Sequence, residues 1–200
     1  MENTEEFAYS FRVAIIGDSG VGKTSILSRY ISESFDSKQI STIGLDLASK
    51  VVEVNDQKVR LMFTDTGGQE RFRSVVTSLL RSVAIVCCVY DITDEKSFHE
   101  MEYWFDQIKN MYDHDEMPVT CVIGNKVDLP NRVITEDMGI ELAKAQHALF
   151  FETSAKEDIN IEVAILECVH KAQDKQSPKE KDQVLQFNEG RIRSGGCCGL

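Results

Sequence analysis

A continuous apolar run at residues 83–90, Val-Ala-Ile-Val-Cys-Cys-Val-Tyr, limits the folds open to this chain more than any other feature. A strand that is apolar on both sides is typical of a parallel sheet covered by helices on both faces. Shorter apolar runs occur at residues 11–17, 119–123 and 149–151. Apolar residues with helical spacing lie between them, at residues 98–108 and 161–168. Residues 47–54 and 58–63 flank Asn55-Asp56 and predict a hairpin. The sequence therefore predicts an α/β fold: a doubly wound, mostly parallel six-stranded sheet with helices on both faces.

Length and charge narrow the class of protein. The 200 residues and the formal net charge of −11 predict one acidic domain with a tail, and the charge opposes nucleic-acid binding. No apolar stretch is long enough to span a membrane, and an acidic start argues against secretion. The expected organisation is an N-terminal extension at 1–10, a folded domain at 11–172 and a flexible C-terminal tail at 173–200.

The six cysteines fall into two groups. Cys87, Cys88 and Cys121 lie in the apolar runs and Cys168 lies in a helical pattern, with spacings that fit neither a disulfide framework nor a zinc site. We expect reduced, buried thiols, with the two neighbouring residues 87 and 88 on opposite faces of their strand. Cys197 and Cys198 stand apart, close to the C-terminus.

Residues 17–24, Gly-Asp-Ser-Gly-Val-Gly-Lys-Thr, form a G-x-x-x-x-G-K-[ST] motif between a predicted strand and a predicted helix. Glycines allow backbone N–H groups to surround phosphates, Lys23 would reach the terminal phosphates, and the Thr24 hydroxyl would bind Mg²⁺. The alternative is a glycine-rich turn that only caps a helix. The predicted phosphate-binding residues are Ser19, Gly20, Val21, Gly22, Lys23, Thr24 and Ser25.

Two later segments suggest a guanine site. Asn125-Lys126-Val-Asp128 follows one apolar run, and the Asp128 carboxylate can accept hydrogen bonds from the ring N–H and the exocyclic amine of guanine, a donor pair that adenine lacks. Asn125 can bind the base edge, and the stem of Lys126 can cover the base face. Ser154, Ala155 and Lys156 follow another run and offer backbone donors to the base oxygen. Each segment alone could be a solvated turn.

Residues that could take part in nucleotide hydrolysis follow the predicted strand at 58–63. Asp65 fits the outer shell of Mg²⁺, the Gly68 N–H fits the γ-phosphate, and Gln69 could orient the attacking water. The hydroxyl of Thr42 could complete the metal shell. Alone, each could equally be an ordinary loop or turn residue.

Together these motifs resemble the small Ras-like GTPases, and within them the Rab subfamily, over about residues 11–171 and the last cysteines. The resemblance implies a P-loop NTPase fold of the small GTPase type, with 11–172 as the GTP-binding domain. It also implies GTP and GDP binding with Mg²⁺, slow GTP hydrolysis, and Phe35 packing against the guanine. An external arginine is worth roughly 10³–10⁵ in rate in this superfamily.

The resemblance further implies a switch that regulates intracellular vesicle traffic by binding effectors in its GTP state. Expected partners are an exchange factor, a GTPase-activating protein and a prenyl-binding chaperone, while the soluble form would be monomeric. Cys197 and Cys198 resemble the Rab pattern that carries one or two geranylgeranyl groups, which predicts a location on the cytoplasmic face of an intracellular membrane, with cycling through the cytosol.

This sequence departs from the family at several positions. Leu47, Thr64 and Leu79 replace an effector-facing Phe, Trp and Tyr, and Leu80 replaces a second tyrosine. Gln39 stands where the family often has a tyrosine over the phosphates, and Gly67 replaces an alanine close to Gln69. Effectors selected for aromatic anchors should bind poorly. One alternative is a GTP-loaded scaffold with negligible turnover. Another, an adenine-specific P-loop kinase or ATPase, is opposed by Asn125 and Asp128.

Overall fold

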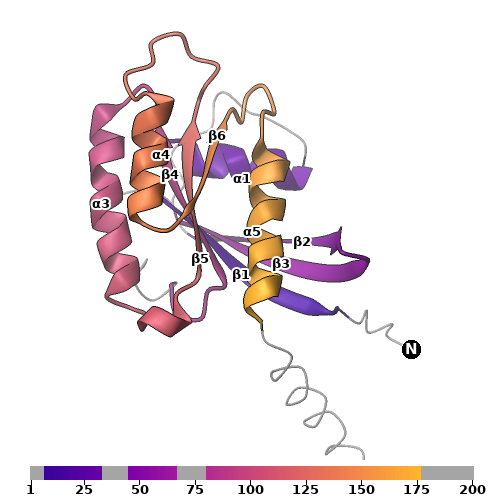
Figure 1. Ribbon diagram of the computed structural model, residues 1–200. Helices are drawn as coiled ribbons and strands as arrows, with labels where there is room; N and C mark the ends of the chain where they lie inside the picture. Colours follow the sequence, from indigo (N-terminus) through magenta and orange to yellow (C-terminus); the bar gives the residue numbers. More distant parts are fainter. Residues whose placement is uncertain (1–6, 33–44, 67–79, 177–200) are drawn as a thin grey trace, which may run out of the picture.

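Six strands form one sheet in the computed structural model, which describes residues 7–32, 45–66 and 80–176. Their order is β2-β3-β1-β4-β5-β6 (Figure 1). Only β2 and β3 are antiparallel, and the other neighbouring strands are parallel. The mostly parallel six-stranded sheet predicted from sequence is confirmed. The bounds are β1 Tyr9–Ile16, β2 Leu45–Val54, β3 Gln57–Thr66, β4 Ile85–Asp91, β5 Val119–Asn125 and β6 Leu149–Thr153.

Helices cover both faces of this sheet (Figure 1). Residues of α1 and α5 pack on one face and residues of α3 and α4 on the other. A short 3-10 helix, η2, precedes β5. In the described part of the chain, no helix is both long and apolar enough to cross a membrane. The bounds are α1 Lys23–Ser32, α3 Glu95–Lys109, η2 His114–Glu116, α4 Glu136–Ala145 and α5 Ile161–Lys175.

The thiols of the core lie as the sequence predicts. Cys87 and Cys121 are register partners on β4 and β5 and share one core with Cys168 of α5, whereas Cys88 belongs to the opposite core. All four are free and buried. A hydrogen bond with Cys168, together with burial, raises the pKa of Cys87 well above its usual value. These thiols therefore stay protonated at neutral pH and behave as small apolar side chains.

The sequence analysis did not predict α4, because this helix packs through small residues. Its buried positions are Gly139 and Ala143. A Cβ on Gly139 would lie 2.4 Å from Cε2 of Phe150, so the close contact with β6 requires glycine. The local signal was the N-cap: the Thr135 side chain accepts a hydrogen bond from Met138 N–H.

Two connections complete the frame. Asn55 and Asp56 join β2 to β3 with φ values of 53° and 57°, which suit a tight hairpin turn. At the other end, α5 continues to Lys175, beyond the expected domain end at 172. Gln173 is buried and its Oε1 accepts a hydrogen bond from Asn55 Nδ2 at 3.5 Å, so packing against the hairpin accompanies the extra turn. The tail from residue 177 lies outside the described residues.

Candidate nucleotide-binding site

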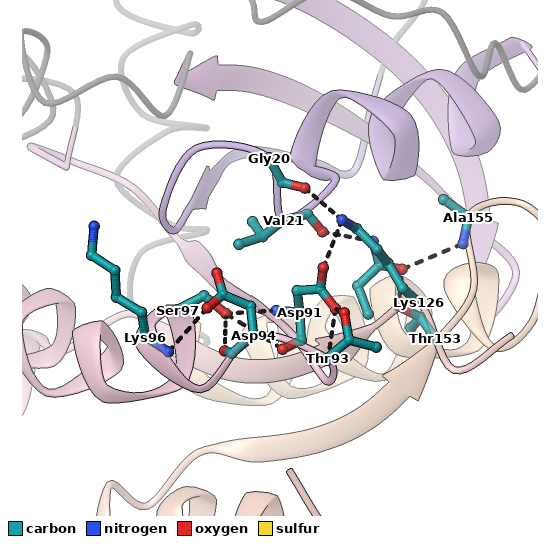
Figure 2. Close-up of polar contacts among 11 residues, drawn as sticks. Gly20, Val21, Asp91, Thr93, Asp94, Lys96, Ser97, Lys126, Thr153 and Ala155 are labelled. Carbon is teal, nitrogen blue, oxygen red and sulfur yellow. Dashed lines mark hydrogen bonds and ion pairs between the residues drawn. The ribbon is translucent and has the colours of Figure 1, made fainter. Parts of the chain in front are cut away.

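The glycine-rich loop at residues 17–22 lies where the strand order reverses. It follows β1, which has β3 on one side and β4 on the other. In open α/β sheets, ligands bind at such a point, beyond the carboxyl ends of the strands. The loops that follow β4, β5 and β6 begin at this same edge, and Figure 2 shows residues from all of them close to Gly20 and Val21.

Glycine is required at both ends of this loop. Gly17 has φ +144°, and a Cβ there would lie 2.2 Å from the Val89 carbonyl oxygen of β4. Gly22 has φ +99°, and its Cβ would lie 2.3 Å from Asn125 Nδ2. Lys23, the first residue of α1, is buried, and its Nζ donates to the carbonyls of Gly17 at 3.0 Å and Asp18 at 2.7 Å. The loop therefore encloses a cation and begins a helix, the arrangement that suits a bound phosphate.

The Asn125 side chain joins three loops. Its Nδ2 donates to the Val21 carbonyl at 2.9 Å, and its Oδ1 accepts from Thr153 Oγ1 at 3.1 Å and from Ala155 N–H at 3.4 Å. Asn125 and Thr153 are almost fully buried. One amide thus fixes the glycine-rich loop, the end of β5 and the end of β6 relative to one another.

The predicted base-binding residues meet beside this amide. Asp128 Oδ1 accepts a hydrogen bond from Ser154 Oγ at 2.6 Å, and its Oδ2 lies 3.8 Å from Lys156 Nζ. From α1, Arg29 donates through Nε to the Ala155 carbonyl and through Nη2 to the Lys156 carbonyl, both at 3.0 Å. Sequence reasoning missed Arg29, because nothing local links it to a loop more than a hundred residues away.

Lys126 also holds the glycine-rich loop. Its Nζ donates to the Gly20 carbonyl at 2.7 Å and forms an ion pair with Asp91 Oδ2 at 2.6 Å (Figure 2). Asp91 is the last residue of β4, and sequence reasoning missed it too. Its only local signal is that it is a charged residue ending an otherwise apolar strand.

The structure describes only some of the remaining residues that the sequence predicts for the site. Ser19 is exposed, and its N–H donates to Asp18 Oδ1 at 2.9 Å, while Thr24 and Ser25 lie in the first turn of α1. Residue Asp65 pairs in register with Ile15, so its position in β3 lies beside the start of the glycine-rich loop. Outside the described residues lie Phe35, Gln39, Thr42, Gly67, Gly68, Gln69, Leu79, Cys197 and Cys198.

Comparison with known proteins agrees with this geometry. The model of the Ras family matches residues 12–174. The chain belongs to the Ras family. Similar proteins within the family include several Rab proteins. It is 34% identical to Ras-related protein Rab-18 of Caenorhabditis elegans, over 95% of each chain. It is 41% identical to Ras-related protein Rab-10 of Diplobatis ommata, over 95% of this chain and 93% of that one. Ras-related protein SEC4 of Saccharomyces cerevisiae is 37% identical, over 95% of this chain and 87% of its own. As a Rab-type member of the Ras family, the chain is a GTPase.

Proposed function

We propose that this Rab-type GTPase is a GTP/GDP switch of intracellular vesicle traffic and that its three joined loops form the guanine-nucleotide site. The observation that carries the proposal is the position of Asn125, which binds the glycine-rich loop and both loops of the base side at once. A nucleotide has to contact the phosphate and base sides together, and this amide holds them in one surface.

The base side favours guanine. Asp128 presents a carboxylate whose Oδ1 is oriented by Ser154 Oγ. Guanine offers it two donors, the ring N–H and the exocyclic amine, whereas adenine would leave the carboxylate without them. Ser154, Ala155 and Lys156 would bind the base oxygen through their backbone, and Phe35 would pack against the ring.

The phosphate side presents N–H groups. In a trans peptide unit the C=O and N–H point in opposite directions. The carbonyls of Gly20 and Val21 are bound by Lys126 and Asn125, so the N–H groups of Val21 and Gly22 point away from those side chains. Ser19, Lys23 and Ser25 would complete the cradle around the phosphates.

The oxygen ligands fit Mg²⁺. Hydroxyl and carboxylate oxygens are its preferred donors, and a nucleotide-bound Mg²⁺ needs few protein ligands because the phosphates supply others. Thr24 is the second residue of α1, next to the loop, and residue Asp65 lies at the same edge of the sheet. With Thr42 they would hold the ion, which when bound would neutralise phosphate charge.

For hydrolysis, Gln69 would orient the attacking water and the Gly68 N–H would bind the γ-phosphate. We expect Gln69→Leu to slow single-turnover GTP hydrolysis strongly, because the water loses its orienting group. An exchange factor and a GTPase-activating protein would set the two rates of the cycle, and effectors would read the GTP state. Hydrolysis at the parental rate in the variant would favour a GTP-loaded scaffold instead.

The tail would carry the membrane anchor. Cys197 and Cys198 would receive geranylgeranyl groups, placing the protein on the cytoplasmic face of an intracellular membrane and, with a prenyl-binding chaperone, in the cytosol. Two chains anchor stably and one only marginally. Changing both cysteines to serine should leave the protein cytosolic with nucleotide binding intact. Membrane fractionation and mass spectrometry of the C-terminal peptide would test this, and an unmodified peptide in the parent would contradict it.

The decisive test of the site is Asp128→Asn. An amide offers one acceptor and one donor, which match the extra oxygen of xanthine, so the variant should lose GTP and gain XTP in a competition assay. Asp158→Asn is the matched control, since it makes the same charge change at an exposed residue of the neighbouring loop. If Asp128→Asn keeps the parental preference for GTP, the base site is assigned wrongly.

A further inference from the structure

Asp91 presents a largely buried carboxylate to the centre of the site. Its Oδ1 accepts hydrogen bonds from Thr93 N–H at 2.8 Å and Thr93 Oγ1 at 2.7 Å (Figure 2). Its Oδ2 pairs with Lys126 Nζ at 2.6 Å, and the side chains of the two partners are 10% and 32% exposed. Both carboxylate oxygens are therefore held in place. Oδ1 is bound by Thr93 of the adjacent turn, whereas Oδ2 contacts Lys126, a residue of the proposed nucleotide site.

The backbone of Asp91 is also held by hydrogen bonds. Its N–H donates to Ser97 Oγ at 3.0 Å, and the hydroxyl of this fully buried serine in α3 donates in turn to the Asp94 carbonyl at 2.8 Å. The turn from β4 into α3 therefore fixes the backbone position from which the Asp91 carboxylate extends. Lys126 is the opposite kind of residue, because its long side chain has many rotamers and needs a partner to hold it.

Lys126 transmits this fixed position to the glycine-rich loop. Its Nζ binds the Gly20 carbonyl at 2.7 Å, and planarity of the peptide unit then directs the Val21 N–H to the other side of the loop. A chain of contacts runs from Thr93 through Asp91 and Lys126 to the peptide unit of Gly20 and Val21.

We propose that Asp91 is a positioning residue for nucleotide binding. Its carboxylate holds the Lys126 ammonium on the Gly20 carbonyl, and so it sets the direction of the Val21 N–H and the path of the lysine stem across the base side. This inference rests on the proposed guanine-nucleotide site and adds to it a residue that would not touch the nucleotide.

The charge of Asp91 predicts whether its removal weakens or strengthens nucleotide binding. A carboxylate near a polyphosphate repels it, and here the repulsion is offset by the ion pair with Lys126. Removing the carboxylate alone should therefore weaken binding, because Lys126 loses its anchor. Removing it when Lys126 is already absent should strengthen binding, because an unpaired buried anion disappears.

The first experiment measures dissociation of a fluorescent GDP from the full chain. Asp91→Asn should release it about tenfold faster, which corresponds to the loss of one charge-assisted hydrogen bond. The matched control is Asp94→Asn, an exposed position three residues away where asparagine also caps α3, and its rate should equal the parental rate. Equal rates for the parent and Asp91→Asn would overturn the inference, whereas a parent that binds no guanine nucleotide would overturn the proposed site itself.

The second experiment is a double-mutant cycle with Lys126→Met. In this background Asp91→Asn should slow GDP release, the reverse of its effect alone. Faster release in both backgrounds would show that Asp91 acts through the general stability of the turn, and would overturn a positioning role.

A milder pair of variants covers the case in which Asp91→Asn does not fold. Thr93→Val removes one hydrogen bond to Asp91 Oδ1 and keeps the ion pair, so GDP release should be about two- to threefold faster. Thr93→Ser keeps the hydroxyl and should match the parent. If Thr93→Val also matches the parent, the carboxylate is not the element that positions Lys126.

Discussion

The proposed phosphate side of this site, the glycine-rich loop, and its proposed base side, the loops after β5 and β6, are built by opposite means. The glycine-rich loop takes its shape from side chains that are missing, since Gly17 and Gly22 lie where a Cβ would meet Val89 or Asn125. The base side takes its shape from side chains that are present, through the hydrogen bonds of Asn125 and Ser154. Where the backbone lies against its neighbours, adding even one side-chain atom causes a steric clash. In a hydrogen-bond network, by contrast, a substitution removes one bond and leaves the others in place. Substitutions on the first side should have abrupt effects, and those on the second should have graded ones.

The largest effect should follow from Gly17→Ala. The added Cβ would meet a backbone oxygen of the buried strand β4 at 2.2 Å, at a φ that alanine rarely adopts. We expect the free energy of unfolding to fall by about 3–5 kcal/mol, from steric overlap and backbone strain together. Urea denaturation followed by circular dichroism would measure it. A loss below about 1 kcal/mol would show that the loop can move away from β4, and the contrast between the two sides would fail.

Gly22→Ala should have the next largest effect, on ligand release. Its Cβ would displace Asn125 Nδ2 from the Val21 carbonyl and so separate the two sides. Gly20→Ala is the matched control, because this glycine also has positive φ, +80°, but its Cβ would have no neighbour within 4 Å. Gly22→Ala should therefore release fluorescent GDP about tenfold faster than Gly20→Ala, the cost of roughly one buried hydrogen bond. Similar rates in both variants would mean that backbone strain alone decides the loop's behaviour.

The smallest effect should come from Thr153→Val on the base side. Valine has nearly the shape of threonine but no donor for Asn125 Oδ1, which keeps the longer bond from Ala155 N–H. Loss of this buried bond should lower the free energy of unfolding by about 1–2 kcal/mol and speed GDP release a few-fold. Urea denaturation and the same release assay would test this, with Thr153→Ser as the control that keeps the hydroxyl. A loss as large as that of Gly17→Ala would contradict a graded response.

How much of the fold the sequence predicted depended on how each element is buried. The run at residues 83–90 predicted β4 because every residue of this strand is buried, although the strand itself begins at Ile85 and ends at Asp91. The hairpin followed from Asn55 and Asp56, whose types tolerate positive φ. By contrast, α4 packs through Gly139 and Ala143, and small residues leave no clear apolar stripe in a sequence.

The same distinction holds for the site. Lys23 and Asn125 could be proposed as site residues from the sequence, because each lies in a short motif of its own whose spacing identifies it. Asp91 and Arg29 could not, because each acts on a residue of another loop and only the strand order brings the partners into contact. The first is a single charge at the end of an apolar strand, and the second is an ordinary basic residue in the last turn of a helix.

The hydrogen bonds of Arg29 have a consequence for the order of events during synthesis. They join α1 to carbonyls 126 and 127 residues further along the chain. A ribosome makes the glycine-rich loop and its helix early, but the partners of Arg29 and the two donors to Asn125 Oδ1 emerge only with β6 and the loop after it. These long-range contacts can form only after residues 153–156 have been synthesised. A nascent chain that ends before them therefore lacks a complete nucleotide site. Guanine nucleotide bound at the proposed site would therefore stabilise the finished domain by mass action and could not guide the first steps of its folding.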